Sequence, residues 1–229
     1  MTYIVSDLCG HSQKFCELLN TVGFTDDDVM YVLGNVTDYG DEPMPLLCDL
    51  SMRANVLPIL GDGDYKAYRF LSAVNGMLED GSAPDAELMA DMALWMTEGG
   101  QNTLTQFREL DSEMREGVLD YLSDMALYEE ITVKGQKYLL VHAGIAGFDP
   151  DTPLEDYMPE DFISEPLDME REYFEDVTVI VGHVPAASLP DADEGMIYYG
   201  EGSINVNGNV AGGGKLFCLC LETGKEYYV

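Results

Sequence analysis

The stretch Leu140-Val141-His142-Ala143-Gly144-Ile145 places a histidine directly after an apolar run, where a glycine-containing turn begins. A second apolar run, Val177 to Val181, leads in the same way to His183. An open α/β sheet builds its site from polar residues that buried strands deliver at their carboxyl ends. Two of the three histidines in the chain therefore follow predicted strands of this kind.

Three apolar runs in the N-terminal part of the chain end in a polar residue in the same way. They are Tyr3 to Val5 before Asp7, Tyr31 to Leu33 before Asn35, and Val56 to Leu60 before Asp62. Because the carboxyl ends of neighbouring strands meet at one edge of a sheet, we expect all five polar residues to converge there. Carboxylate, amide and imidazole groups are metal ligands, so this convergence predicts a metal-binding site.

The remaining periodicity predicts an α/β fold of the α+β type, in one domain over residues 1–229. Helical spacing of apolar residues predicts helices over residues 11–22, 44–54, 64–78 and 85–96, and another that opens at Ser112. Later strands are predicted over residues 131–133, 138–141, 204–206, 216–221 and 226–229. Residues 147–172 are acidic, contain several prolines and lack periodicity, so we expect a mobile loop region there.

The charge balance restricts the partners of this chain. It carries 43 acidic and 11 basic residues, a formal net charge of −32. Such a field repels nucleic acid, and a phosphorylated substrate would need local compensation by metal ions. No run reaches the roughly 18 apolar residues of a membrane span, and no basic segment precedes an apolar one at the N-terminus. We therefore expect a cytoplasmic protein that binds neither nucleic acid nor membrane.

The five cysteines are odd in number and lack zinc-finger spacing, which favours reduced thiols. Cys16, Cys48, Cys218 and Cys220 lie in apolar contexts and are predicted to be small core residues. Cys9 lies next to the predicted site, where a thiolate would favour zinc over magnesium and a protonated thiol would be inert. Both interpretations of Cys9 stay open. The apolar face of the helix over 85–96 is predicted to pack in the core or to cap it, and it consists of Leu88, Met89, Met92, Leu94, Trp95 and Met96.

Several motifs in the order of the chain resemble those of the calcineurin-like metallophosphoesterases. These motifs are S-D-L-C-G, L-G-N-V-T-D-Y-G, L-G-D-G-D, L-V-H-A-G-I, V-G-H-V-P and I-N-V-N-G. The segment Glu98 to Leu104 also resembles the family's N-G-G-x-x-T-L, and the nearest branch is that of bacterial and phage phosphoprotein phosphatases and diadenosine tetraphosphatases. The resemblance implies two mixed β-sheets flanked by helices in a four-layer sandwich. It further implies metal ions at the strand ends and a phosphorylated small molecule or phosphoprotein as substrate.

The same resemblance assigns metal-ligand positions, and three of them depart from the family pattern. The positions are Asp7, Cys9, Asn35, Asp62, His142 and His183. Cys9 stands where the family has a histidine, Asn35 where it has the bridging aspartate, and Asp62 where it has an asparagine. Asp62, His142 and His183 would still suit one zinc or manganese ion. A neutral Asn35 cannot screen two cations roughly 3.5–4 Å apart, so we expect one metal or none.

Two of the family's catalytic positions also carry other residues in this chain. The family's general-acid histidine is Gly63 and its phosphate-binding arginine is Tyr39, whereas Asp38 and Asp64 keep the pattern and are assigned to catalysis. Lys66 and Arg69 are expected to be solvated surface charges, and His11 to lie at a helix start on the surface.

We therefore expect a degenerate phosphoesterase, or pseudophosphatase, that keeps the fold and binds a metal, a nucleotide or a protein partner. A working metal-dependent phosphoesterase with a rearranged, zinc-biased site is the first alternative. An acidic interaction module that mimics a polyanion is the second.

Overall fold

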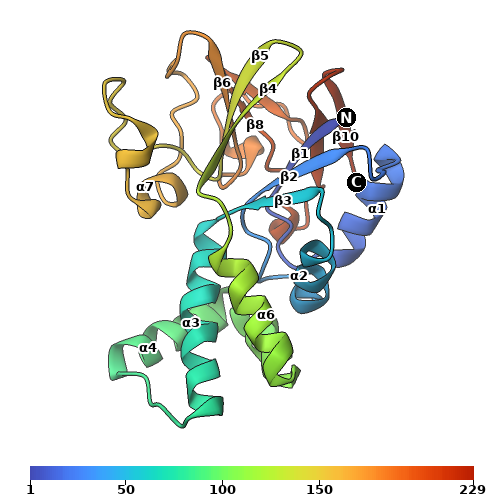
Figure 1. The fold of residues 1–229 in the computed structure, drawn as a ribbon. Coiled ribbons are helices and arrows are strands. Elements are labelled where there is room, and N and C mark those ends of the chain that lie inside the picture. Colours follow the sequence, from blue (N-terminus) through green and yellow to red (C-terminus); the bar gives the residue numbers. More distant parts are fainter.

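The first of two β-sheets carries the N-terminal strands of the chain, in the order β10-β9-β1-β2-β3. In the computed structural model, which describes residues 1–229, β1 pairs in parallel with β2, and β2 with β3, whereas β9 and β10 are antiparallel (Figure 1). The strands are β1 (Thr2–Ser6), β2 (Val29–Leu33), β3 (Val56–Ile59), β9 (Phe217–Cys220) and β10 (Lys225–Tyr228). Parallel pairing brings the carboxyl ends of β1, β2 and β3 to one edge.

The second sheet is built from the C-terminal half of the chain, in the order β4-β5-β6-β8-β7. Its strands are β4 (Tyr128–Val133), β5 (Gln136–Val141), β6 (Val177–Val181), β7 (Tyr198–Gly200) and β8 (Ser203–Asn205). The central pairs β5–β6 and β6–β8 are parallel, and the outer pairs are antiparallel. Both sheets are therefore mixed, which confirms the predicted architecture of two mixed sheets flanked by helices.

The helices before β4 cover the first sheet or extend from it, whereas the helix after β5 lies beside the second sheet (Figure 1). The helices are α1 (Ser12–Val22), α2 (Pro43–Ser51), α3 (Asp62–Glu79), α4 (Ala86–Trp95), α5 (Gln101–Glu109), α6 (Ser112–Ser123) and α7 (Pro159–Ile163). A π-turn over Met96–Gly100 joins α4 to α5. None of these helices combines the length and the hydrophobicity that a membrane span requires.

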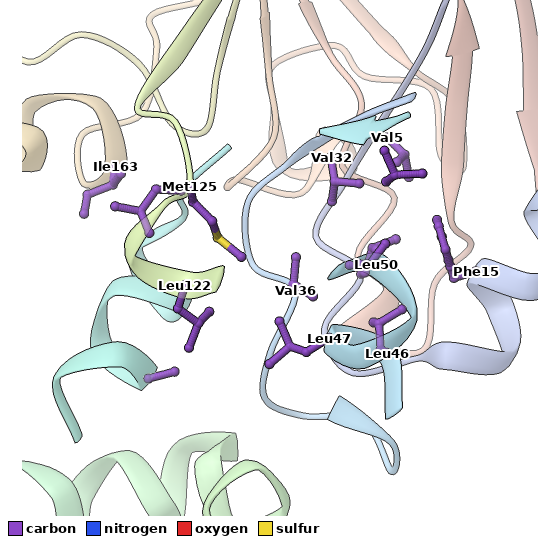
Figure 2. Close-up of a cluster of buried hydrophobic side chains, with 14 of the residues drawn as sticks. Val5, Phe15, Val32, Val36, Leu46, Leu47, Leu50, Leu122, Met125 and Ile163 are labelled. Atoms are coloured by element: carbon purple, nitrogen blue, oxygen red, sulfur yellow. The ribbon is translucent and has the colours of Figure 1, made fainter. Parts of the chain in front are cut away.

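Strand alternation divides the buried side chains into two clusters. Ile4 of β1 belongs to a smaller cluster that includes Leu140 of β5, so this cluster joins the two sheets. Val5 points to the other side of β1 and belongs to the larger cluster. In that cluster, Figure 2 shows Leu46, Leu47 and Leu50 of α2 beneath the strands, with Val36 between α2 and the end of α6.

The structure differs from the sequence predictions in several segments. Helix α5 and strand β7 were not predicted, and residues 147–172 contain α7, whose Phe162 is fully buried and packs on Tyr128. That segment is therefore anchored at its centre. Its apolar residues follow no helical or strand period because α7 is only five residues long.

The cysteine predictions were right for two of the four residues. Cys218 and Cys220 are buried and Cys48 is partly buried, but Cys16 is exposed on α1, so its assignment to the core was wrong. On α4, Met92 and Trp95 are buried as predicted. Met89 and Leu94 are exposed, because a helix with apolar residues on several faces can bury only one of them.

Candidate metal centre

The polar residues at the ends of five strands lie together, as the sequence predicts. Asp7 follows β1, Asn35 follows β2 and Asp62 opens α3 after β3. His142 follows β5, and His183 comes two residues after β6. Hydrogen bonds connect the group: Asn35 with Asp7 and Asp62, and His142 with Asp62 and His183. Both sheets therefore contribute to one site.

The backbone at this edge is held in a conformation that few side chains adopt. Asp7, Asn35 and His183 have φ angles of 52°, 52° and 60°, in the left-handed region. Each such residue costs on the order of 1–3 kcal/mol, and such strain concentrates at functional sites. Gly182 permits the close approach of the sheets, since a Cβ there would lie 2.5 Å from Asp7 Oδ2.

The orientation of the Asn35 side chain is fixed by the backbone of α3. The Gly63 N–H donates to Asn35 Oδ1 at 2.8 Å, so the amide nitrogen must point the other way. Asn35 Nδ2 donates to Asp7 Oδ1 at 3.1 Å and to Asp62 Oδ1 at 3.2 Å. A hydrogen-bond donor therefore lies between the two carboxylates.

Asp62, His142 and His183 form a group whose ligand atoms all lie within 4.8 Å of one another. His142 Nε2 is 3.1 Å from His183 Nδ1 and 3.3 Å from Asp62 Oδ1. The carbonyl of Leu33 accepts from His142 Nδ1 at 2.8 Å, which leaves Nε2 with a free lone pair in the neutral ring. The carboxylate and imidazole lone pairs meet at one point and would repel one another without a cation or a proton between them. This donor set fits a divalent metal ion.

The electrostatics of this triad agree with that assignment. Burial alone would lower the pKa of His142, but the hydrogen bond to Asp62 and the charge of Asp7 raise it above its ordinary value. Burial opposes ionisation of Asp62, yet hydrogen bonds from His142, His183 and Lys66 hold the pKa of this carboxyl well below its usual range. The triad thus attracts positive charge.

Lys66 is a site residue that the sequence prediction missed. Its Nζ lies 2.9 Å from Asp62 Oδ2, although about half of its side chain is exposed. The signal was present in the sequence, because Lys66 lies four residues after Asp62 and the two share one helix face. Lys66 is exposed, as predicted for a surface charge, but its ion pair with Asp62 was not predicted. Arg69, predicted likewise, is exposed and lies over the ring of Phe70.

In the half of the site that contains Asp7, both carboxylate oxygens accept hydrogen bonds from other groups of the protein. Asp7 Oδ2 accepts from the His183 backbone N–H at 3.0 Å, and Asp7 Oδ1 accepts from Asn35. Cys9 is buried, and burial raises the pKa of its thiol well above the ordinary value. Neither Asp7 nor Cys9 belongs to the group of converging ligand atoms.

Asp38 and Asp64 are buried and bond to the surrounding protein. Asp38 accepts hydrogen bonds from Trp95 Nε1 and Thr103 Oγ1, both at 2.7 Å. Thr103 lies in the motif quoted above, but nothing in the sequence linked the single tryptophan to the site.

Asp64 accepts backbone N–H bonds from Val36 at 2.9 Å and from Thr37 and Gly61 at 3.2 Å. Burial raises its pKa to about 6. These contacts position the loop after β2 beneath Asn35.

A small cleft beside Asp62 contains positions 39 and 63, where the sequence departs from the arginine and the histidine that the resemblance implies. Tyr39, Gly63, Lys66 and Glu98 line it, and its volume is about 50 Å³. Tyr39 is largely exposed, and its backbone N–H donates to Gly99. His11 lies away from this cleft, directly before α1, as predicted for a helix-start residue.

The loop that carries His183 is held by two asparagines of the I-N-V-N-G segment. Asn207 Nδ2 donates to the carbonyl of His183 at 2.9 Å. Asn205 Nδ2 donates to the carbonyls of Gly182 and Val184. The sequence indicates this segment only as a motif, and the structure shows that it positions a histidine of the triad.

Solved structures with the same fold include phosphoesterases of several kinds. A candidate diadenosine tetraphosphatase has a TM-score of 0.64 and 18% identity, over 100% of this chain and 92% of its own. A metallophosphoesterase from Sphaerobacter thermophilus has a TM-score of 0.55 and 15% identity, over 99% and 86%. A protein serine/threonine phosphatase from Saccharomyces cerevisiae has a TM-score of 0.53 and 11% identity, over 95% and 71%.

No curated protein matches the sequence closely enough to count as a relative. The family model of the calcineurin-like phosphoesterases, however, matches residues 2–208, which include every residue of the site described above. This chain therefore belongs to the calcineurin-like phosphoesterase family.

Proposed function

We propose that this protein is a degenerate metallophosphoesterase that keeps the fold and one metal site but hydrolyses phosphoesters poorly or not at all. The amide of Asn35 carries the proposal. Its orientation is fixed by Gly63, so it presents N–H groups to Asp7 and Asp62, where an acceptor would be needed to bridge two cations. Two divalent ions repel strongly without such a bridge.

The positions beside the triad support the proposal. Gly63 has no side chain, and the loss of a general acid alone costs about a hundredfold or more in rate. Tyr39 offers a phenol in place of a bidentate guanidinium, which removes the fork that grips a phosphate. In a chain with a net charge of −32, an anionic substrate has little other attraction to this edge.

One ion would be held by Asp62, His142 and His183, with zinc or manganese as the fitting metals. A bound ion of this type supplies a Lewis acid that polarises a phosphoryl oxygen and acidifies a water. The protein's own residues orient the site: Leu33 fixes the tautomer of His142, and Asn207 fixes the loop of His183. In the other half of the family's dinuclear pattern, Asn35 donates a hydrogen bond to Asp7.

Metal content and turnover test this proposal together. We expect about one equivalent of metal per chain after purification without chelator. Hydrolysis of an aryl phosphate with added zinc, manganese or nickel should be at or near background. A stoichiometric pair of ions would contradict the argument from Asn35. Robust turnover of an aryl phosphate or a dinucleoside polyphosphate, abolished by His142→Ala, would show an active enzyme.

Restoring the family pattern should rescue activity only as a set. The combined variant carries Cys9→His, Asn35→Asp, Tyr39→Arg, Asp62→Asn and Gly63→His. A Cβ at position 63 would lie 2.8 Å from Asn35 Oδ1, so histidine there requires position 35 to change its contacts. Residues that act as one catalytic unit are strongly non-additive, so no single reversion should suffice.

A working phosphoesterase with a rearranged, zinc-biased site is the second candidate, and Lys66 is the observation that favours it. Its ammonium lies beside Asp62 in the cleft with Tyr39, where it can meet a phosphate oxygen. A phosphorylated small molecule or phosphoprotein would be the substrate, and the cytoplasm its place of action. Turnover that is lost in Lys66→Ala and kept in Arg69→Ala would support this candidate.

A further inference from the structure

A long apolar groove runs along α2, on surface that the metal centre does not use. It consists of two adjoining hollows of about 270 and 370 Å³ that share Cys48 and Met114. The first lies between α2 and α6 and includes Leu47, Met52 and Val118. The second lies between α2 and α5 and includes Met44, Pro45 and Leu110. Together they leave an apolar channel open to solvent.

The walls of this groove are rich in methionine. Met52 is 81% exposed and Met114 is 46% exposed, whereas Met44 is buried at the base. Unbranched thioether side chains adapt to differently shaped partners and are over-represented on surfaces that bind peptides. Contiguous exposed apolar surface on a protein of this charge marks an interaction site better than it marks a core defect.

Gly117 in the middle of α6 widens the groove at a cost to the helix. A glycine inside a helix destabilises by roughly 0.5–1 kcal/mol relative to alanine. A Cβ at this position would meet nothing within 4 Å, so no contact within the chain requires glycine here. Gly117 lies on the same face of α6 as Met114, Val118 and Tyr121, which line the hollow. The missing side chain leaves room for an occupant.

Acidic residues border the groove. Glu113, Glu116 and Asp120 are exposed and form a stripe on α6 directly beside its lining face. Glu109 of α5 lines the second hollow. The nearby bases are committed elsewhere: Arg53 pairs with Asp49 and Arg115 with Glu79. Arg108 lies off the α5 face that Gln106 and Glu109 present to the groove. The rim is therefore negative.

We propose that this groove binds a basic amphipathic helix of a partner protein. Apolar residues of that helix at i, i+3 or i+4 spacing would insert between α2 and α6, and its Lys and Arg residues would face the acidic rim. Helix α2 is nine residues long, enough to hold about two and a half turns of a bound helix. The proposal is independent of the metal centre.

Binding of a synthetic peptide to the full chain tests the proposal. The probe is a helix of about 18 residues built from Leu and Lys with a Trp reporter. Its controls are a scrambled Leu–Lys peptide of equal charge and a Leu–Glu peptide of equal pattern. We expect saturable one-to-one binding of the amphipathic Leu–Lys peptide alone, weakened by salt. Equal binding of the scrambled peptide would show attraction by net charge only and would overturn the proposal.

Variants locate the contact. Gly117→Tyr fills the hollow and Met114→Asp makes it polar, so each should weaken binding by about tenfold or more. Gly117→Ala adds only a methyl group and should bind within about threefold of the unmodified chain. Met196→Asp changes an exposed methionine outside the groove and should leave binding unchanged. Circular dichroism and melting confirm that each variant is folded. Unchanged affinity in folded Gly117→Tyr would overturn the proposal. So would concentration-dependent dimerisation that Gly117→Tyr abolishes, because it would show that the occupant is a second copy of this chain.

Discussion

The two halves of the metal centre each contain an aspartate, but the hydrogen-bond states of the two halves are opposite. In the half formed by Asp62, His142 and His183, acceptor atoms converge within 4.8 Å and call for a positive charge between them. In the half formed by Asp7 and Cys9, the carboxylate already accepts from Asn35 and from the His183 backbone, and the thiol is buried and protonated. A cation would offset the converging acceptors in the first half, whereas hydrogen-bond donors of the protein take its place in the second.

Asn35 bonds to both halves, so the difference lies in the His183 backbone N–H at Asp7 and in the two imidazoles at Asp62. An aspartate at position 35 would add a negative charge shared by both halves, whereas the amide donates to a carboxylate in each. The two N–H groups of the amide thus stabilise the two carboxylates, as a shared pair of ions would do by their charge. A carboxylate at a strand end can thus be satisfied by hydrogen bonds within the protein, whereas converging carboxylate and imidazole acceptors leave a place for a cation.

The largest effect is expected from replacing Asp64, which holds the loop after β2 that both halves of the site share. Asp64→Ala should lower the free energy of unfolding by about 3 kcal/mol or more, because three buried N–H groups lose their acceptor. Urea unfolding measures the loss. Asp41→Ala, an exposed neighbour in the next loop, should change stability by less than about 0.5 kcal/mol. A similar small effect for Asp64→Ala would show that this carboxylate does not hold the loop.

Metal binding tests the two halves against each other directly. His142→Ala should weaken zinc affinity about a hundredfold or more, since it removes a ligand from the converging group, whereas Asp7→Asn should weaken it less than about fivefold. Competition with a chromophoric chelator gives both affinities. Chelator should also lower the melting temperature of the zinc-loaded protein, because an ion that binds only the folded state stabilises it. Equal losses in the two variants would show that Asp7 is a ligand and that the halves are not distinct.

The positions of the site residues at strand ends could be predicted from the sequence better than the contacts that these residues make. Each of the five site residues follows an apolar run, so convergence at strand ends could be predicted from alternation and turns; strand pairing within each sheet and the packing of the two sheets on each other bring the residues together. The orientation of the Asn35 amide could not, because it depends on the Gly63 N–H, a contact between backbone and side chain that leaves no residue pattern. The same holds for Trp95, whose contact with Asp38 crosses from α4 to the loop after β2. Short elements such as α7 were missed because fewer than two helical turns give no period.

Replacing Trp95, which donates a hydrogen bond to Asp38, should change the stability of the protein by an amount that depends on pH. Trp95→Phe should reduce stability by about 1.5–3 kcal/mol at about pH 8, because the ionised form of Asp38, which is more populated at higher pH, loses a charge-assisted donor. Burial raises the pKa of Asp38, so the folded state holds a proton more tightly than the unfolded state does. Asp38 itself therefore adds stability at low pH that is lost as pH rises through its folded pKa.

The Trp95 hydrogen bond follows the opposite trend, because it favours the charged form of Asp38. The loss caused by Trp95→Phe should accordingly be smaller at about pH 5 than at about pH 8. Urea unfolding of both proteins at the two pH values measures this, and a pH-independent loss would mean that the indole contributes only packing against Phe70.

The smallest expected effect concerns Lys66. It tests how the charge of this side chain affects cation binding in the half of the site that contains Asp62. The Lys66 ammonium lies 2.9 Å from Asp62 Oδ2 and competes with any cation that Asp62 holds. Lys66→Met should therefore raise zinc affinity, but only about two- to fivefold, because the half-exposed lysine is screened by solvent. Arg69→Met, which removes a charge one turn further along α3, should have less effect still. Titrations at low and high salt separate the two contributions, since a gain from removed repulsion shrinks as salt increases. A fall in zinc affinity in Lys66→Met would mean that the ammonium orients Asp62 as a ligand rather than competing for it.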